Sequence, residues 1–152
     1  MRHLWIYAIL ISSSVMLQAR ADDSAEFKEY KALFGKWKCV GIESAVHKGV
    51  VPQGTAQVRG NEFDFIRKDG STGTRHYISV DPNRNPKTID FTQRDGKQKG
   101  QKLLGIYKIE DGVLTFVLSP SDDESKRPES FELSRESVGV KYTLKRLGEE
   151  VR

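Results

Sequence analysis

The chain has 152 residues, with 25 basic and 21 acidic side chains and a formal net charge of +4. Its single cysteine, its aperiodic glycines, and the absence of heptads and of long apolar spans exclude a disulfide framework, a collagen-like repeat, a coiled coil and a polytopic membrane protein. The remaining class is a small globular domain with one modest core.

The first 21 residues have the pattern of a removable export signal. A basic start precedes an apolar stretch from Leu4 to Leu17, and Ala19-Arg20-Ala21 is a small-x-small cleavage site. A membrane anchor is the alternative, but the apolar run is short and has no stop-transfer charges. We expect removal of 1–21, export to the periplasm or the outside, no membrane span afterwards, and one domain over 22–152. Loss of Arg2 and Arg20 leaves a net charge of +2, which does not by itself imply polyanion binding.

A short helix is predicted directly after the signal. Asp23 can cap it, Glu26 occupies the reciprocal capping-box position, and Gly35 ends it. Its apolar residues fall on one face with a period of 3.6: Phe27, Tyr30, Leu33 and Phe34.

The remaining chain changes to a period of two, which predicts β-strands closed by tight turns. The predicted strands are Trp37 to Glu43, Ala56 to Arg59, Glu62 to Arg67, Thr74 to Val80, Thr88 to Gln93, Leu103 to Ile109, Val113 to Leu118, Ser130 to Leu133, and Val140 to Leu147. Without helical crossovers these strands form an antiparallel meander that closes to remove its edges. The fold class is therefore all-β, an up-and-down barrel of about eight strands with a short N-terminal helix.

Two connections differ from the tight turns. Asp81 to Pro86 contains two prolines and predicts a rigid corner. The segment from Ser119 to Pro128 is rich in charged residues and predicts a solvated loop.

The start and end of the predicted barrel resemble the lipocalin, or calycin, arrangement. Gly35-Lys36-Trp37 opens the first strand after a short helix, and Tyr142-Thr143-Leu144-Lys145-Arg146 closes the last strand. In that superfamily a Gly-x-Trp sequence places an indole at the closed end of the barrel. The resemblance implies that Gly35 and Trp37 lie at that end and that Arg146, or Lys145 in another register, stacks on the indole by a cation–π contact.

A second resemblance covers the chain from Phe34 to Arg146. Five segments in this order are similar to an uncharacterised exported domain family known mainly from planctomycetes: Phe34-Gly35-Lys36-Trp37, Asp81-Pro82-Asn83-Arg84-Asn85-Pro86-Lys87-Thr88-Ile89-Asp90, Leu104-Gly105-Ile106-Tyr107, Leu114-Thr115-Phe116-Val117-Leu118 and Leu144-Lys145-Arg146. The resemblance implies a lipocalin-like fold without an established activity. The sequence departs from the family after Leu118, where members commonly carry a shorter loop with cysteine or alanine before proline.

Five aromatic residues are candidates for the barrel interior. Alternation places them on one face of their strands, so we expect them to point inward. They either fill one another or line a cavity for a small apolar or amphipathic ligand. These residues are Phe63, Phe65, Phe91, Tyr107 and Phe116.

The marked charge cluster is basic and lies on a predicted hairpin tip, where glycines stand at positions 96 and 100. It suits an anionic surface component or protein, with a solvated loop as the alternative. Nucleic acid is not expected, because no exposed aromatic residues are interleaved. The cluster consists of Arg94, Lys97, Lys99 and Lys102.

No cofactor, metal site or catalytic constellation is predicted. His47 and His76 are the histidines after the signal and show no zinc-ligand spacing, and Asp122-Asp123-Glu124 lacks the spacing of a calcium loop. Cys39 lacks a disulfide partner, and its alternation with lysines favours a small buried hydrophobe over a nucleophile. His76 and Ser79 would point to opposite faces of a strand.

The predicted function is therefore non-catalytic binding. The first hypothesis is capture of a small apolar or amphipathic molecule in the barrel, with the five interior aromatic residues as its wall. The alternative is a periplasmic or cell-surface interaction module that acts through its loops and has a packed interior.

Overall fold

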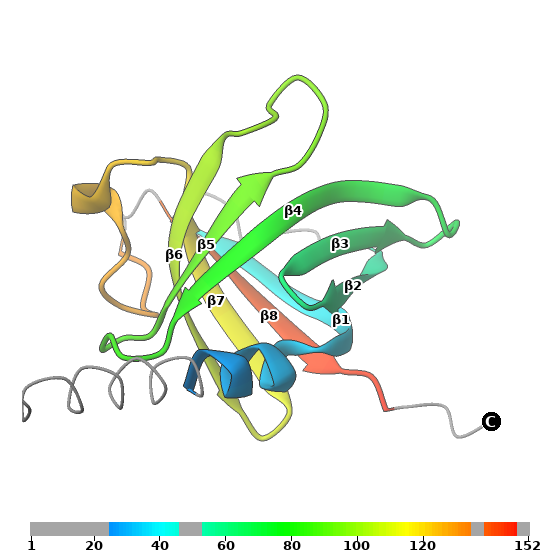
Figure 1. Cartoon of the computed structure of the whole chain (residues 1–152), viewed down its shortest axis with the longest axis horizontal. Coiled ribbons are helices and arrows are strands. Elements are labelled where there is room, and N and C mark those ends of the chain that lie inside the picture. The colour runs from blue at the N-terminus through cyan, green and yellow to red at the C-terminus, as the bar shows by residue number, and fades with distance from the viewer. Residues whose placement is uncertain (1–24, 46–52, 135–138, 149–152) are drawn as a thin grey trace, which may run out of the picture.

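The computed structural model describes residues 25–45, 53–134 and 139–148. Eight antiparallel strands close into one barrel, in which every strand pairs with its neighbours in sequence and β8 pairs with β1 (Figure 1). The strands are β1 (Gly35–Ser44), β2 (Gly54–Arg59), β3 (Glu62–Arg67), β4 (Thr72–Asp81), β5 (Thr88–Gln93), β6 (Lys102–Glu110), β7 (Val113–Ser119) and β8 (Val140–Arg146). The predicted all-β antiparallel barrel is confirmed.

Residues 25–33 form the predicted helix, which lies across the end of the barrel where β1 begins and β8 ends (Figure 1). Leu33 is buried in the core, and the Tyr30 hydroxyl donates a hydrogen bond to the carbonyl of Ile78 at 3.3 Å. Phe27 and Phe34 remain 60% and 54% exposed, so only part of the predicted apolar face packs on the barrel. The predicted cap Asp23 and the predicted signal lie outside the described residues.

One predicted strand is wrong. Residues 130–133 form no strand, because β7 and β8 already pair with each other through seven-residue strands and leave no free edge beside them. The other eight predicted strands are present.

The barrel core consists of the inward residues of all eight strands together with Leu33. Alternation puts polar residues outside on most strands, as the period of two predicts. Strands β6 and β7 differ, because Leu104, Ile106 and Val117 face outward and are nevertheless buried.

The chain between β7 and β8 explains this burial. Residues 120–134, here called the covering loop, run along the outside of β6 and β7 and include a short 3-10 turn at Glu124–Lys126 (Figure 1). The predicted solvated loop is exposed over 122–126, but the Arg127 side chain near its end is only 11% exposed, so this part of the prediction is wrong. The sequence predicted a strand over 130–133 within this loop, and the contact of the loop with the outside of β6 and β7 was not predicted.

Candidate functional surfaces

The middle of the barrel is filled by aromatic rings. Phe63 on β3 and Phe116 on β7 come from opposite walls, because four positions separate these strands in the ring of eight. Their ring centroids are 6.0 Å apart, and Phe91 contacts both at 5.0 and 5.3 Å. All three residues are buried. The lumen is therefore spanned at this level by packed side chains rather than by a deep cavity.

Phe65 lies nearer the open end and is only half-buried. Its ring covers two glycines, since a Cβ added at Gly54 or Gly73 would approach the ring to 2.8 or 2.9 Å. A side chain at either position would displace the ring. These glycines therefore allow the aromatic side chain to lie flat against the neighbouring strands.

Two polar side chains share this upper part of the lumen. His76 lies against Phe91 at 5.5 Å, and its Nδ1 is buried without a hydrogen-bond partner among the described residues. Burial lowers the pKa of His76, against the opposing effects of Asp95, a hydrogen bond with Gln93 and Asp64, so the neutral imidazole is favoured. Tyr142 stacks on Phe116 at 5.0 Å, and burial raises the pKa of its phenol.

The helix and the last strand build the closed end around Trp37, which is fully buried. Its Nε1 donates to the carbonyl of Leu33 at 2.8 Å. Arg146, rather than Lys145, lies over the indole, with Cζ 4.1 Å from the ring centroid. Arg146 also donates to the carbonyls of Ala32 and Phe34, so one guanidinium joins the helix end to the barrel.

Two further predicted residues belong to this end. Gly35 has a φ of 121°, which L side chains rarely adopt, and an added Cβ would approach Arg146 Nη1 to 3.2 Å. The buried Tyr107 donates from its hydroxyl to Glu29 on the helix at 2.8 Å. Burial, followed by this carboxylate, raises the pKa of the Tyr107 phenol. Tyr107 therefore contacts the helix, whereas Phe63, Phe91 and Phe116 meet one another.

The predicted basic hairpin projects beyond the barrel between β5 and β6 (Figure 1). Its members differ in charge compensation. Arg94 pairs with Glu62 at 3.1 Å and Asp64 at 3.2 Å and covers the ring of Tyr77. The other three cations are exposed and have no ion-pair partner among the described residues: Lys97, Lys99 and Lys102.

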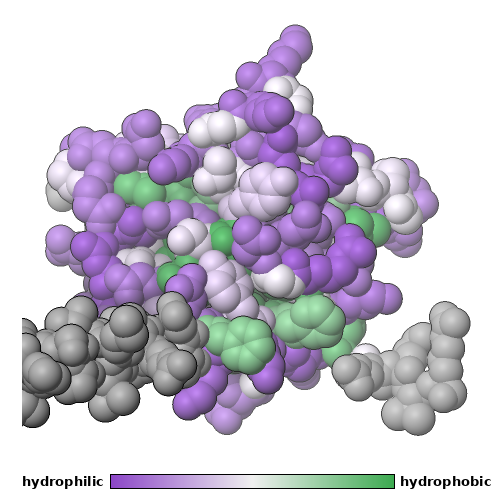
Figure 2. Space-filling view, viewed as in Figure 1, coloured by the Kyte–Doolittle hydropathy of each residue, from purple (hydrophilic) through white to green (hydrophobic). Residues whose placement is uncertain are grey.

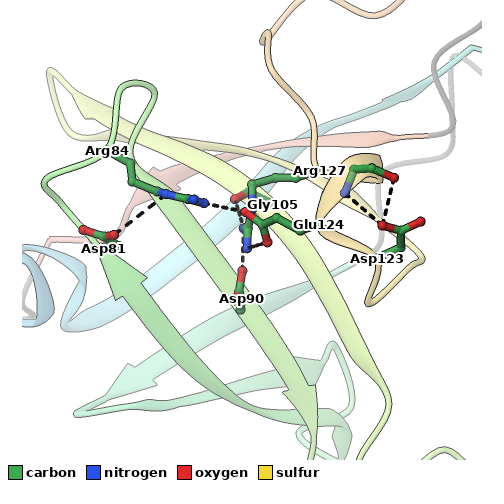
Figure 3. A network of polar contacts seen from close by, with 8 residues as sticks. Asp81, Arg84, Asp90, Gly105, Asp123, Glu124 and Arg127 are labelled. Atoms are coloured by element: carbon green, nitrogen blue, oxygen red, sulfur yellow. Dashed lines mark hydrogen bonds and ion pairs between the residues drawn. The ribbon is translucent and has the colours of Figure 1, made fainter.

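A polar network attaches the covering loop to the barrel (Figure 3). Arg127 Nη1 donates to Asp90 at 2.6 Å and to the carbonyl of Gly105 at 2.8 Å, and its Nε donates to Glu124 at 2.8 Å. Arg84 from the β4–β5 corner reaches the same Glu124 at 2.5 Å. The hydrogen bonds from Arg127 and then Arg84 lower the pKa of Glu124 to about 2.

Two clefts flank this network on the outside of the barrel. One of about 300 Å³ is lined by Arg84, Ile106 and Arg127, and one of about 880 Å³ lies between Val117 and the covering loop. The arginines do not make the first cleft an anion site, because both already share Glu124. The network fixes the loop, and we assign it a structural role.

The histidine, serine and cysteine side chains considered as reactive groups lie apart from one another in the described part of the chain. Among the described residues, no group of three or more histidine, cysteine or acidic side chains could hold a metal ion. Ser79 is exposed on the outside, whereas His76 is half-buried in the lumen, so the two do not meet. Cys39 is buried, and burial raises the pKa of its thiol, which opposes a nucleophilic role. His47 lies outside the described residues.

The chain was also compared with known proteins. No family model, curated protein or solved structure matches it. Within the described part of the chain, no helix combines the length and apolar character needed to cross a membrane.

Sequence reasoning missed the anchoring role of Arg127. Arg127 stands beside Lys126 in a charged segment, where nothing distinguishes a buried arginine from a solvated one. No local signal was available, because its acceptors, Asp90 and the Gly105 carbonyl, lie on β5 and β6. Gly105 itself marks a close approach of β6 to β7, where an added Cβ would come within 2.5 Å of the Val117 carbonyl oxygen.

Proposed function

We propose that this chain is an exported, lipocalin-like, non-catalytic interaction module that binds an anionic surface component or protein through its β5–β6 hairpin. The observation that carries the proposal is the meeting of Phe63 and Phe116 across the lumen at 6.0 Å. Because side chains fill the lumen at this level, we infer that binding uses the outer surface of the barrel instead. The Gly35-x-Trp37 sequence and the Arg146 contact support the lipocalin-like assignment.

The hairpin has the charge and the accessibility that such binding needs. Lys97, Lys99 and Lys102 keep uncompensated charges on a projecting turn, while Arg94 is bound to the barrel by Glu62 and Asp64. Arg94 therefore fixes the base of the hairpin and the three lysines are its contact residues. Exposed charges of this kind steer association and make binding sensitive to salt.

A heparin column is a suitable first probe, because heparin is a soluble anionic polymer. The variant Lys97→Glu/Lys99→Glu should elute at lower salt than wild type. In a pull-down from cell-envelope extract, the variant should no longer recover the partner that wild type recovers. The control Lys68→Glu/Lys126→Glu makes the same change in net charge at exposed positions outside the hairpin. If both variants eluted at equally lowered salt concentrations, binding would depend on net charge alone, which would refute the hairpin as the binding site.

A small apolar or amphipathic ligand at the open end is the second candidate. It is favoured by half-buried Phe65 and by His76, which lies opposite Phe63 in the register of β3 and β4 and whose buried Nδ1 has no partner among the described residues. Such a ligand would lie above the ring contacts of Phe63, Phe91 and Phe116, with Phe65 as its main apolar contact.

Native mass spectrometry of the protein purified from its own host separates the two candidates. A stoichiometric bound molecule, released on denaturation and lost from Phe65→Ala beyond the effect of that change on stability, would establish the ligand hypothesis. A mass equal to that of the bare chain after gentle purification would favour the hairpin module.

A further inference from the structure

Two large aromatic side chains stay in water at the closed end of the barrel. Phe27 is 60% and Phe34 is 54% exposed. Phe34 directly follows the helix, and its N–H donates to the Tyr30 carbonyl at 2.9 Å, so the helical turn continues to Phe34 and the spacing of seven residues puts both rings on the same side. Leu147, 37% exposed, follows β8 and donates its backbone N–H to the carbonyl of Lys36 at 2.9 Å. Figure 2 shows this hydrophobic surface along the edge of the molecule where the helix lies, on a face that is otherwise mostly hydrophilic. Apolar residues gathered in this way mark an interaction surface more often than isolated ones do.

Lysines surround these apolar groups. Lys31 Nζ lies 4.5 Å from the centroid of the Phe27 ring, and exposed Lys36 follows Phe34 by two residues. We call Phe27, Lys31, Phe34, Lys36 and Leu147 the closed-end patch. Neither lysine of the patch has an ion-pair partner among the described residues, so its charge faces solvent.

The neighbouring outer face of β1 and β8 extends this positive charge. Lys38 and Lys145 are directly opposite each other in the register of the two strands, and both are exposed. Like charges in this relation destabilise a sheet slightly. No acidic side chain in the described part of the chain forms an ion pair with either lysine. An anionic surface placed against this face would remove the repulsion.

We propose that the closed-end patch docks on an anionic phospholipid bilayer. Phe27, Phe34 and Leu147 enter the headgroup region, where aromatic and aliphatic side chains leave water, and the lysines meet lipid phosphates. The combination of exposed phenylalanines with basic residues on one side of a helix is the composition that interfacial helices use. The β5–β6 hairpin stands at the other end of the barrel, so it points away from the membrane and stays free for its own partner.

The test is vesicle flotation of residues 22–152, which contain the helix and all eight strands of the closed barrel. Vesicles of phosphatidylglycerol and phosphatidylethanolamine are compared with vesicles of phosphatidylcholine alone. The variants are Phe27→Ser/Phe34→Ser and Lys31→Gln/Lys36→Gln, with Lys97→Gln/Lys99→Gln as the matched control. Both phenylalanines are more than half exposed, so the serine variant should unfold at nearly the wild-type denaturant midpoint.

We expect binding to the anionic vesicles only, weakened by added salt. Each lysine removed from the patch should lower the partition coefficient about fivefold, the equivalent of about 1 kcal/mol near a charged membrane surface. The serine variant should lose at least about tenfold, because its apolar contact with the bilayer is gone. The control should bind as wild type does.

Three results would overturn the proposal. The first is no flotation with anionic vesicles. The second is flotation that the serine variant retains. The third is a loss in the Lys97→Gln/Lys99→Gln control as large as in the patch variants, which would assign lipid binding to the hairpin.

Sedimentation measures the oligomeric state in parallel. A wild-type dimer that the serine variant converts to monomer, without vesicle binding, would make the patch a self-association surface instead.

Discussion

Replacement of Trp37 by alanine tests the closed end most directly. The indole is fully buried, donates to the carbonyl of Leu33 at 2.8 Å and carries the Arg146 guanidinium on its face. Truncation of a buried aromatic residue to alanine costs about 3 to 5 kcal/mol from lost burial and the cavity left behind. We expect a loss in that range for Trp37→Ala, a large part of the about 5 to 15 kcal/mol that stabilises a small domain.

Trp37→Phe separates the contributions. It keeps an aromatic ring but removes the Nε1 donor and leaves the Leu33 carbonyl without that partner. We expect a loss of about 1 to 3 kcal/mol, the cost of an unsatisfied buried polar group. Phe34→Ala is the control three residues away, and because Phe34 is 54% exposed its change should stay within about 0.5 kcal/mol.

The assay is urea unfolding of residues 22–152 followed by far-ultraviolet circular dichroism. Tryptophan fluorescence does not serve, because Trp37 is the only tryptophan after residue 21. A loss below about 1 kcal/mol for Trp37→Ala, which is typical of surface substitutions, would refute the description of the closed end as a packed junction of helix and barrel.

Three further predictions concern other parts of the barrel. Arg127→Met removes the donor to Asp90 and the Gly105 carbonyl, so we expect a loss of about 1 to 3 kcal/mol and faster hydrogen exchange over 120–134, whereas Lys126→Met should change neither. The Glu124 pKa is lowered to about 2, so its ion pairs are complete above its ordinary value of 4.5 and are lost as pH falls toward 2. The hydrogen-exchange protection of the covering loop should therefore fall between these pH values in wild type. In Glu124→Gln this protection should be lower and should not change with pH. Burial lowers the pKa of His76 below 6.5, so the unfolded chain takes up the proton first and the free energy of unfolding should fall as pH drops below 6.5. His76→Phe should make the free energy of unfolding, measured in urea, depend less on pH. An unchanged dependence would contradict the buried position of His76.

The sequence predicted most of the barrel because its signals are local. A period of two, closed by pairs such as Asp111-Gly112, specifies a strand and its turn from adjacent residues; Asp111 indeed has a positive φ of 49°. Eight of the nine predicted strands are present for this reason. The closure of the barrel was also predicted, because a meander of eight strands without helices leaves two free edges, and these can pair with each other.

The missed features depend on residues far apart in sequence. Arg127 anchors to Asp90 and Gly105, which lie 37 and 22 residues away, and no local pattern predicts such a contact. The same holds for Arg94, which sequence reasoning grouped with the exposed lysines but which pairs with Glu62 and Asp64. A sequence shows which residues are charged, but which of them form ion pairs depends on the fold.

The pairing of β1 with β8 has a consequence for the order of events during biosynthesis. The first strand of the barrel finds its second neighbour only when Val140–Arg146 has left the ribosome, so the sheet stays open for almost the whole of synthesis. An open sheet exposes the unpaired edge of Gly35–Ser44 and invites aggregation. Because closure waits for the last strand, a chain that stops before Val140 would keep this edge unpaired and the barrel could not close.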